Sequence, residues 1–390
     1  MPSPGRMDKE PIMKQSVRLG VLSGLSVLLA ACGSSNSSSS GPALPSGVEV
    51  LQGAYHLSIF AQATGVLSTL RPDDLLQVGS TVYVNYQDHN NLPDGSSAPG
   101  TTPQSMLAAY NLQGQLLATY KVPGHPDGLV TPDGSKVWVS SNEDGNPLLT
   151  ILDPQQNTLT TLSSDTLPLP HGGGLDDMKV IGGQVYVSAS APSTTMSPTP
   201  NLAPYSTDAS GATAQYGVNT GPVLYQLTLN SDGKTYHLSS VLSSSTPATL
   251  LPGKTPVTLN MTDADSSAID PAGDLVVDSQ QDSELVFIKN PGQSSMAVSV
   301  LPITLYGNPW PIDDTRWAPA ASGTGVVPYM LFSDNKGQII YRVDENGGFS
   351  AGTAYSSAQG MIVQTDTSTG MLTPIIMGLN APHGMIFAQP

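Results

Sequence analysis

Charged residues and cysteine are both scarce in this sequence. Asp, Glu, Lys and Arg make up only 11% of its 390 residues, where about 25% is usual. Lys and Arg together number 14 against 30 acidic residues, so the formal net charge is −16. Binding of nucleic acid requires clustered basic side chains that neutralise phosphates, and this balance excludes it. The single cysteine, Cys32, has no disulfide partner in the chain, so the fold has to be stabilised by its core.

Several catalytic motifs are missing as well. The chain has no His-Glu-x-x-His, no Cys-x-x-Cys, no Walker loop and no EF-hand loop, which argues against zincins and nucleotide-dependent enzymes. Glycine and proline are abundant instead, with 39 and 34 residues. Together with a hydrophobic content of 38%, they predict many short strands joined by turns and argue against a helical bundle.

The N-terminal region has the features of a secretory signal. An apolar stretch, Leu19 to Ala31, follows Lys14 and Arg18 and is too short to span a bilayer. Its last residues, Leu29-Ala30-Ala31-Cys32, resemble the bacterial lipobox, whose cysteine is lipidated and becomes the mature N-terminus.

This resemblance implies three parts of the chain. We expect a lipoprotein signal peptide over residues 1–31, the lipidated cysteine with a flexible Ser-rich linker over 32–47, and one domain over 48–390. The protein is then exported and bound to a membrane through its lipid anchor. Where the cell has two membranes, we expect the outer one, with the domain facing the periplasm or the cell surface.

One short pattern recurs along the domain. It consists of an acidic residue, a hydrophobic stretch, a glycine turn and a triplet of β-forming residues. Four copies start at Asp73, Asp127, Asp176 and Asp265, and they reach their triplets after 9, 10, 9 and 10 residues. A fifth copy starts at Asp313 and reaches Met330-Leu331-Phe332 after an insertion, and a sixth, at His383, runs into the C-terminus.

The repeat predicts the fold. Two further apolar runs follow most of the triplets, which gives four short strands per repeat of about 50 residues, as in a propeller blade. We therefore predict an all-β fold, a six-bladed β-propeller with four-stranded blades. The strand at Tyr55 to Phe60 is expected to complete the blade of the C-terminal strand, and the stretches 318–329 and 345–360 are expected to be loops.

The chain also resembles the six-bladed propellers of the SMP-30/gluconolactonase, NHL and YVTN-type group. The residues that carry the resemblance are Asp127-Gly128-Leu129-Val130, the turn Ile269-Asp270-Pro271-Ala272-Gly273, and Pro382-His383-Gly384. The resemblance implies a propeller and a hydrolase of the lactonase or esterase type. It also implies one divalent cation, held in the channel by a glutamate and Asn or Asp side chains. In this sequence the predicted first strands carry Asp and His in place of glutamate.

The repeated acidic residues define a candidate site. Loops that lead into the innermost strands of a propeller open at one end of its channel, so a ring is expected there, formed by Asp73, Asp127, Asp176, Asp265, Asp313 and His383. Asp74, Asp177 and Asp314 would add to its charge. Crowded carboxylates raise one another's pKa, and a divalent cation with oxygen ligands would relieve the repulsion. Calcium is the first expectation, and zinc the second if the histidines of these loops converge.

Three of the six histidines, His125, His171 and His383, fall on the same loops and are the predicted catalytic residues. Gly172-Gly173-Gly174 would let His171 approach a ligand closely. Each aspartate has a second interpretation, because an Asp at a strand start often only accepts backbone N–H bonds. Residues after the second strands, such as Asn142-Glu143-Asp144, could reach the same face, but turn chemistry explains them equally well.

Two functions are open from the sequence. The first is a metal-dependent hydrolase of a small ester or lactone, in which the ion polarises the carbonyl and a loop histidine acts as base. The second is a non-catalytic propeller that binds a small molecule, a partner protein or another component of the cell envelope. For either function we expect a monomer.

Overall fold

The structure, a computed structural model, describes residues 42–190, 194–195, 218–219, 221–320 and 325–390. Cys32, the predicted signal peptide and most of the predicted linker lie outside these residues. Residues 41–390 form a compact unit of their own. Among the described residues, no helix combines the length and the hydropathy that crossing a bilayer requires.

Strand pairing groups most of the strands into six four-stranded antiparallel sets. The first three sets, each from its inner to its outer strand, are β3 (Arg71–Val78), β4 (Thr81–Gln87), β5 (Ser105–Asn111) and β6 (Leu116–Val122); β7 (Pro126–Val130), β8 (Val137–Ser141), β9 (Leu148–Asp153) and β10 (Thr158–Ser164); β11 (Met178–Ile181), β12 (Gln184–Ser188), β15 (Pro222–Leu229) and β16 (Thr235–Ser243).

The other three sets are β19 (Ala264–Ile269), β20 (Leu275–Ser279), β21 (Glu284–Lys289) and β22 (Ala297–Pro302); β25 (Ile312–Trp317), β28 (Ala354–Ala358), β29 (Met361–Asp366) and β30 (Met371–Met377); β31 (Pro382–Ala388), β26 (Tyr329–Asp334), β27 (Ile339–Glu345) and β2 (Tyr55–Gln62). Smaller elements are β1 (Glu49–Val50), a 3-10 helix (Gly65–Leu67), β13 (Thr194–Thr195), β14 (Val218–Asn219), β17 (Pro247–Leu250), β18 (Thr255–Thr258), β23 (Thr304–Leu305) and β24 (Asn308–Pro309).

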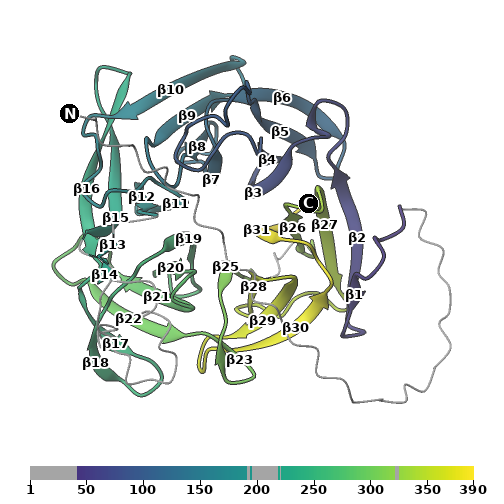
Figure 1. Cartoon of the computed structure of the whole chain (residues 1–390). Coiled ribbons are helices and arrows are strands. Elements are labelled where there is room, and N and C mark those ends of the chain that lie inside the picture. The colour runs from purple at the N-terminus through teal and green to yellow at the C-terminus, as the bar shows by residue number, and fades with distance from the viewer. Residues whose placement is uncertain (1–41, 191–193, 196–217, 220, 321–324) are drawn as a thin grey trace, which may run out of the picture. The chain divides into compact units, whose positions relative to one another are not determined.

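The sets follow one another around a ring, with β3, β7, β11, β19, β25 and β31 nearest its centre (Figure 1). Each of these inner strands contacts the next, and β31 contacts β3, so the ring is closed. This is a β-propeller, as predicted from the repeat. The first four copies of the repeat are inner strands paired with second strands, and the sixth copy is the inner strand β31.

Hydrophobic clusters fill the spaces between neighbouring sets. In β4, Val82 and Val84 belong to a cluster shared with Leu331, while Tyr83 faces the other way into a cluster shared with Val137. Side chains alternate between the two faces of a strand, so a sheet packed on both sides needs apolar residues at consecutive positions. Burial of each such side chain contributes about 1.5–3 kcal/mol. The hydrophobic triplets of the repeat have this role.

The fifth repeat differs from the prediction. Its inner strand, β25, pairs with β28 and not with the triplet Met330-Leu331-Phe332. That triplet lies in β26, which pairs with β31 and belongs to the sixth set. The stretch 345–360, predicted to be a loop, therefore contains a buried second strand. After β25 the chain forms β26 and β27 of the sixth set, then returns to the fifth set for β28, β29 and β30, and ends in the sixth set as β31. The N-terminal strand β2 completes the sixth set, as predicted.

Candidate functional site

Irregular strand pairing in the inner strands aims the predicted acidic side chains at the channel. The ladder between β3 and β4 shifts register between Pro72 and Leu75, on either side of Asp73 and Asp74. Equivalent shifts flank the corresponding residues of β7, β19 and β25. A bulge of this kind kinks the strand and re-aims its side chains. Two consecutive residues can therefore both point toward the channel.

Two aspartates of the predicted ring, Asp73 and Asp313, meet around His383. Its Nδ1 lies 3.1 Å from Oδ1 of Asp73 and 3.7 Å from Oδ2 of Asp313. Gln280 donates a hydrogen bond of 2.7 Å to the other oxygen of Asp313, Oδ1. Three inner strands, β3, β25 and β31, are thus joined through one histidine.

A second group lies around Asp127. His125 Nδ1 is 3.2 Å from Asp127 Oδ1, and Gln87 donates a hydrogen bond of 2.9 Å to the same oxygen. Asn335 in turn donates to Gln87 Oε1 at 3.1 Å and lies 3.5 Å from Asp73 Oδ1. This amide pair connects the two groups. The end of the ring of inner strands at which they lie is called the mouth of the channel below.

Glu143 joins the site although it was not among the predicted site residues. It follows the second strand β8, and its ligand oxygen lies within 4.8 Å of those of Asp176 and Asp265. Burial and the neighbouring carboxyl group of Asp265 raise the pKa of Asp176 well above its usual range, so the close approach of these groups favours a proton or a cation between them. The sequence signal was the polar run after β8, and turn chemistry explained that run equally well.

The glycine loop at 172–174 positions Glu143. Gly174 donates its backbone N–H to the carbonyl of Glu143 at 2.8 Å. A Cβ on Gly174 would lie 1.9 Å from the carbonyl oxygen of Asn142, so only glycine permits this approach. Gly174 therefore supports the backbone under Glu143.

His171 lies apart from the ring. Its Nδ1 is 2.9 Å from the hydroxyl of Tyr225 and its Nε2 is 2.8 Å from the carbonyl of Gly174. Burial lowers its pKa to about 4, so the ring is neutral. Both nitrogens are engaged within the fold, and this geometry does not favour the predicted catalytic role of His171.

The charge at the mouth is unbalanced. Burial raises the pKa of Asp176 and Asp265 well above the ordinary range, and neighbouring carboxylates raise both further. Burial alone would lower the pKa of His383, but Asp313 and Asp73 outweigh it and raise this pKa to about 10. In the same way Asp127 outweighs the effect of burial on His125, whose pKa rises to about 9. Two imidazolium groups therefore face a larger number of carboxyl groups, and the site favours further positive charge.

A second acidic layer borders the ring and carries its own counter-charge. Arg316 on β25 is paired with Asp314 and lies 3.8 Å from Asp177 and 4.0 Å from Asp74. Lys179 is paired with Asp177 as well. Two cationic side chains therefore offset part of the charge of these three aspartates. Among the described residues, the ion pairs of Asp73, Asp127 and Asp313 are with histidines.

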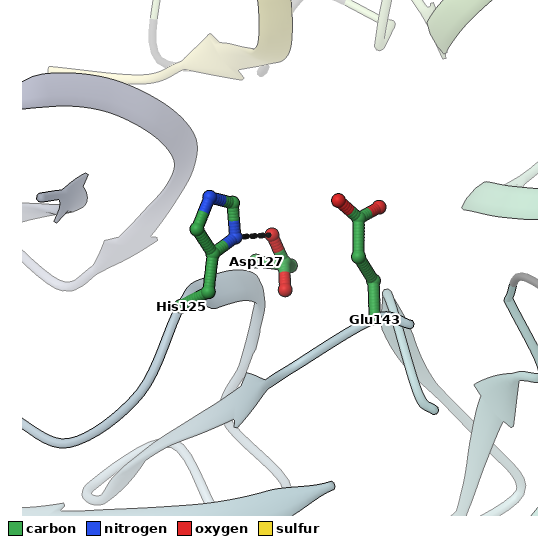
Figure 2. Close-up of side chains that lie close together, drawn as sticks. All are labelled: His125, Asp127 and Glu143. Atoms are coloured by element: carbon green, nitrogen blue, oxygen red, sulfur yellow. Dashed lines mark hydrogen bonds and ion pairs between the residues drawn. The ribbon is translucent and has the colours of Figure 1, made fainter. Parts of the chain in front are cut away.

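The donor set at the mouth fits a divalent cation. His125, Asp127 and Glu143 offer ligand atoms within 4.8 Å of one another, and so do Glu143, Asp176 and Asp265. Figure 2 shows His125 and Asp127 joined by their hydrogen bond, with the carboxylate of Glu143 beside them and bonded to neither. Oδ2 of Asp127 is buried and has no hydrogen-bond partner among the described residues. Carboxylate oxygens with an imidazole are ordinary ligands of divalent metals.

One familiar motif match lies elsewhere. Residues 348–352 read Gly-Phe-Ser-Ala-Gly, which fits the pattern Gly-x-Ser-x-Gly of serine hydrolases. A nucleophile elbow requires a strand, a sharp turn and a helix. Here Ser350 is exposed in the connection between β27 and β28, and a strand follows. This segment therefore does not form an elbow.

Comparisons with known proteins give similar folds at low sequence identity. No family model matches the chain, and no curated protein matches it in sequence. A candidate gluconolactonase has 13% identity and a TM-score of 0.45, with 85% of this chain and 83% of the other covered. Virginiamycin B lyase from Staphylococcus aureus has 11% identity and a TM-score of 0.43, with 86% and 96% covered. At such values, residue roles do not transfer from those proteins to this chain.

Proposed function

We propose that this protein binds a divalent cation at the mouth of its channel, with Glu143, Asp176 and Asp265 as ligands. The observation that carries the proposal is the convergence of three carboxyl groups, since the ligand atoms of Glu143, Asp176 and Asp265 all lie within 4.8 Å of one another. Two carboxyl groups at this distance need a proton or a cation between them. Since all three ligands are oxygens, calcium is the first choice of ion and zinc the second.

We further propose that the site hydrolyses a small ester or lactone. A bound cation would polarise the substrate carbonyl. His383 and His125 hold protons in the metal-free protein, because Asp73, Asp313 and Asp127 stabilise their charged forms. In that state His383 can donate a hydrogen bond to a developing oxyanion or a leaving oxygen, so its metal-free pKa favours the role of acid over that of base.

The second candidate is a propeller that binds a cationic or metal-bridged ligand without catalysis. It is favoured by the same raised pKa values, since neither His125 nor His383 is a neutral base at pH 7 without the ion. The acidic ring would then act as the binding surface for a small molecule or an envelope component.

An assay with a panel of uncharged lactones and phenyl esters separates the two. Initial rates would be measured with calcium, with zinc and with chelator, in wild type, in Asp265→Asn, and in Glu49→Gln, which alters an exposed carboxylate on β1. The hydrolase predicts ion-dependent turnover that Asp265→Asn lowers at least tenfold and Glu49→Gln leaves unchanged. Ion binding without turnover of any ester would leave the binding propeller.

We also propose that Cys32 anchors the protein in a membrane. The support is the lipobox-like run that ends at Cys32 and the Ser-rich segment after it. Wild type should fractionate with membranes and carry the mass of a lipid on its N-terminal peptide. Cys32→Ser should release the protein or leave it unprocessed, and unchanged membrane association of this variant would contradict the proposal.

A further inference from the structure

We propose that the channel mouth holds two divalent cations side by side, the second bound by His125, Asp127 and Glu143, with Glu143 shared between the sites. This inference rests on the cation site proposed above and adds a neighbour to it. The two sets of ligand atoms are separate except for Glu143, and each set is compact, with its atoms within 4.8 Å of one another.

The spacing of His125 and Asp127 suits a common ion. Their Nδ1 and Oδ1 atoms are 3.2 Å apart. An ion about 2.1 Å from each atom, the usual zinc distance, would see them at an angle of about 100°. This value lies between the ideal octahedral and tetrahedral angles, so an ion that replaces the proton of this hydrogen bond fits the present separation of the two atoms. Figure 2 shows the same ring nitrogen facing Asp127 and Glu143.

Asp127 also has an oxygen that the protein leaves without a donor. The residue is 5% exposed, and its buried Oδ2 has no hydrogen-bond partner in the part of the chain that the structure describes. A buried carboxylate oxygen without a partner is costly, by about 1–3 kcal/mol or more for a charged group. Its other oxygen accepts hydrogen bonds from His125 and Gln87. When the ion replaces the hydrogen bond from His125, Gln87 still holds Asp127 in place, and Oδ2 is a further oxygen that can bind the ion.

The backbone holds the other two ligands in place as well. Asn142 accepts the backbone N–H of His125 at its Oδ1 and donates its own backbone N–H to the carbonyl of His125, at 2.8 and 2.7 Å. Glu143 is the next residue, and Gly174 binds its carbonyl. Ligands that are fixed before binding lose little entropy when the ion arrives. The two strand ends that carry this set are therefore tied to each other.

Glu143 has two carboxylate oxygens and can offer one to each ion. In two-metal sites the ions lie about 3.5–4 Å apart, and one carboxylate commonly lies between them. The two sets differ in chemistry, because the first contains only oxygens and the second contains an imidazole. We expect calcium or manganese in the first, and zinc or manganese in the second.

Manganese can occupy both sets and is the probe of choice. The purified protein would be stripped with chelator and titrated with manganese by calorimetry, and the loaded protein would be examined by electron paramagnetic resonance. We expect two equivalents per chain and a spin-coupled pair. Asp127→Asn and His125→Gln should each leave one equivalent with an uncoupled signal. Asp265→Asn should remove the first site and also leave one equivalent with an uncoupled signal. Glu143→Gln should weaken manganese binding at both sites.

The outcomes separate the two proposals. If wild type binds one equivalent of manganese, and Asp127→Asn and His125→Gln each bind it as well, the second site is overturned and the first remains. No bound manganese in wild type would overturn both. Glu49→Gln controls for the general loss of a carboxylate, and circular dichroism confirms that each variant is folded. His125→Gln alters a half-buried residue, so it provides the result if Asp127→Asn does not fold.

Discussion

Arg316 on β25 lies 3.8 Å from the carboxylate of Asp177, which precedes β11 in a different set of strands. Asp177 also accepts the backbone N–H of Ser267 on β19 at 2.9 Å. Asp74 and Asp314 accept the N–H groups of Leu129 and Met385 in the same way, at 2.9 and 2.8 Å. Each aspartate thus ties its own inner strand to the next, and Arg316 ties the three aspartates together.

Replacement of Arg316 by methionine should therefore destabilise the domain strongly. Removal of one partner from a buried ion pair costs about 3–5 kcal/mol, because the remaining charges are left buried. Arg342→Met is the control, since Arg342 and Asp344 form an ion pair at the surface, where the loss is about 0–1 kcal/mol. Urea unfolding measures both, and equal losses in the two variants would contradict this role of Arg316.

Gly128→Ala should disturb the same layer by steric contact. A Cβ at this position would lie 2.5 Å from Cα of Asp177 and 2.8 Å from the carbonyl oxygen of Asp176. Both are main-chain atoms, so relief requires movement of the neighbouring strand, at about 1–3 kcal/mol. Gly53→Ala is the control because its Cβ would meet nothing within 4 Å. A Gly128→Ala variant as stable as Gly53→Ala would refute the close packing.

The sequence pattern predicted the inner strands but not all of their partners. The spacing from each Asp to its triplet reflects one tight hairpin, a local feature that is read directly from sequence. The pairing of β25 with β28 depends on which distant strand fills the space beside it. β26 contains the apolar run Met330-Leu331-Phe332, which resembles the triplets of the other repeats, whereas β28 reads Ala-Tyr-Ser-Ser-Ala. The pattern therefore favoured the wrong strand.

The same limit applies to the site. Asp73 and Asp127 were found because they recur at fixed positions of the repeat. Glu143 occurs once, after a second strand, and reaches the mouth only because the glycine loop at Gly174 packs against its backbone. His171 lies on the expected loop, but the hydroxyl of Tyr225 and the carbonyl of Gly174 bind its ring. Contacts of this kind come from tertiary packing and are not encoded in spacing.

Glu284 gives a pH-dependent prediction that does not involve the mouth. Its side chain is buried, neither carboxylate oxygen has a hydrogen-bond partner within the described ranges of the chain, and burial raises its pKa well above the ordinary range. The folded protein then holds a proton that the unfolded chain releases near pH 4.5. Wild type should lose up to about 1.4 kcal/mol per pH unit above that value, until the folded pKa is reached. Glu284→Gln should lack this loss, so its stability relative to wild type should increase from pH 5 to pH 8, as measured by urea unfolding. A difference in stability that stays constant over this range would show that Glu284 is ionised in the folded protein.

The mouth predicts a pH dependence that a cation should reduce. The pKa values of His125 and His383 rise to about 9 and 10, above their unfolded values, so their stabilisation is complete below about pH 6.5 and is lost as the pH rises. The raised pKa values of Asp176 and Asp265 act in the same direction. His171, with its lowered pKa of about 4, acts only below this range.

Metal-free protein should therefore become less stable between pH 6.5 and 8.5, and saturating calcium should flatten the slope, because the ion replaces the protons. Urea unfolding with chelator and with calcium measures the two slopes. A metal-free protein whose stability rises over this range would contradict the assigned protonation states.

The central claim is that the folded channel mouth binds a divalent cation, and thermal unfolding tests it most directly. An ion that binds only the folded state stabilises it by about 2.7 kcal/mol at a hundredfold excess over Kd. Melting would be followed with chelator, calcium and zinc in wild type, Glu143→Gln and Glu49→Gln. We predict a higher Tm with calcium or zinc in wild type and Glu49→Gln, and little change in Glu143→Gln. Equal melting temperatures of wild type in all three solutions, with no metal found by elemental analysis, would contradict the claim.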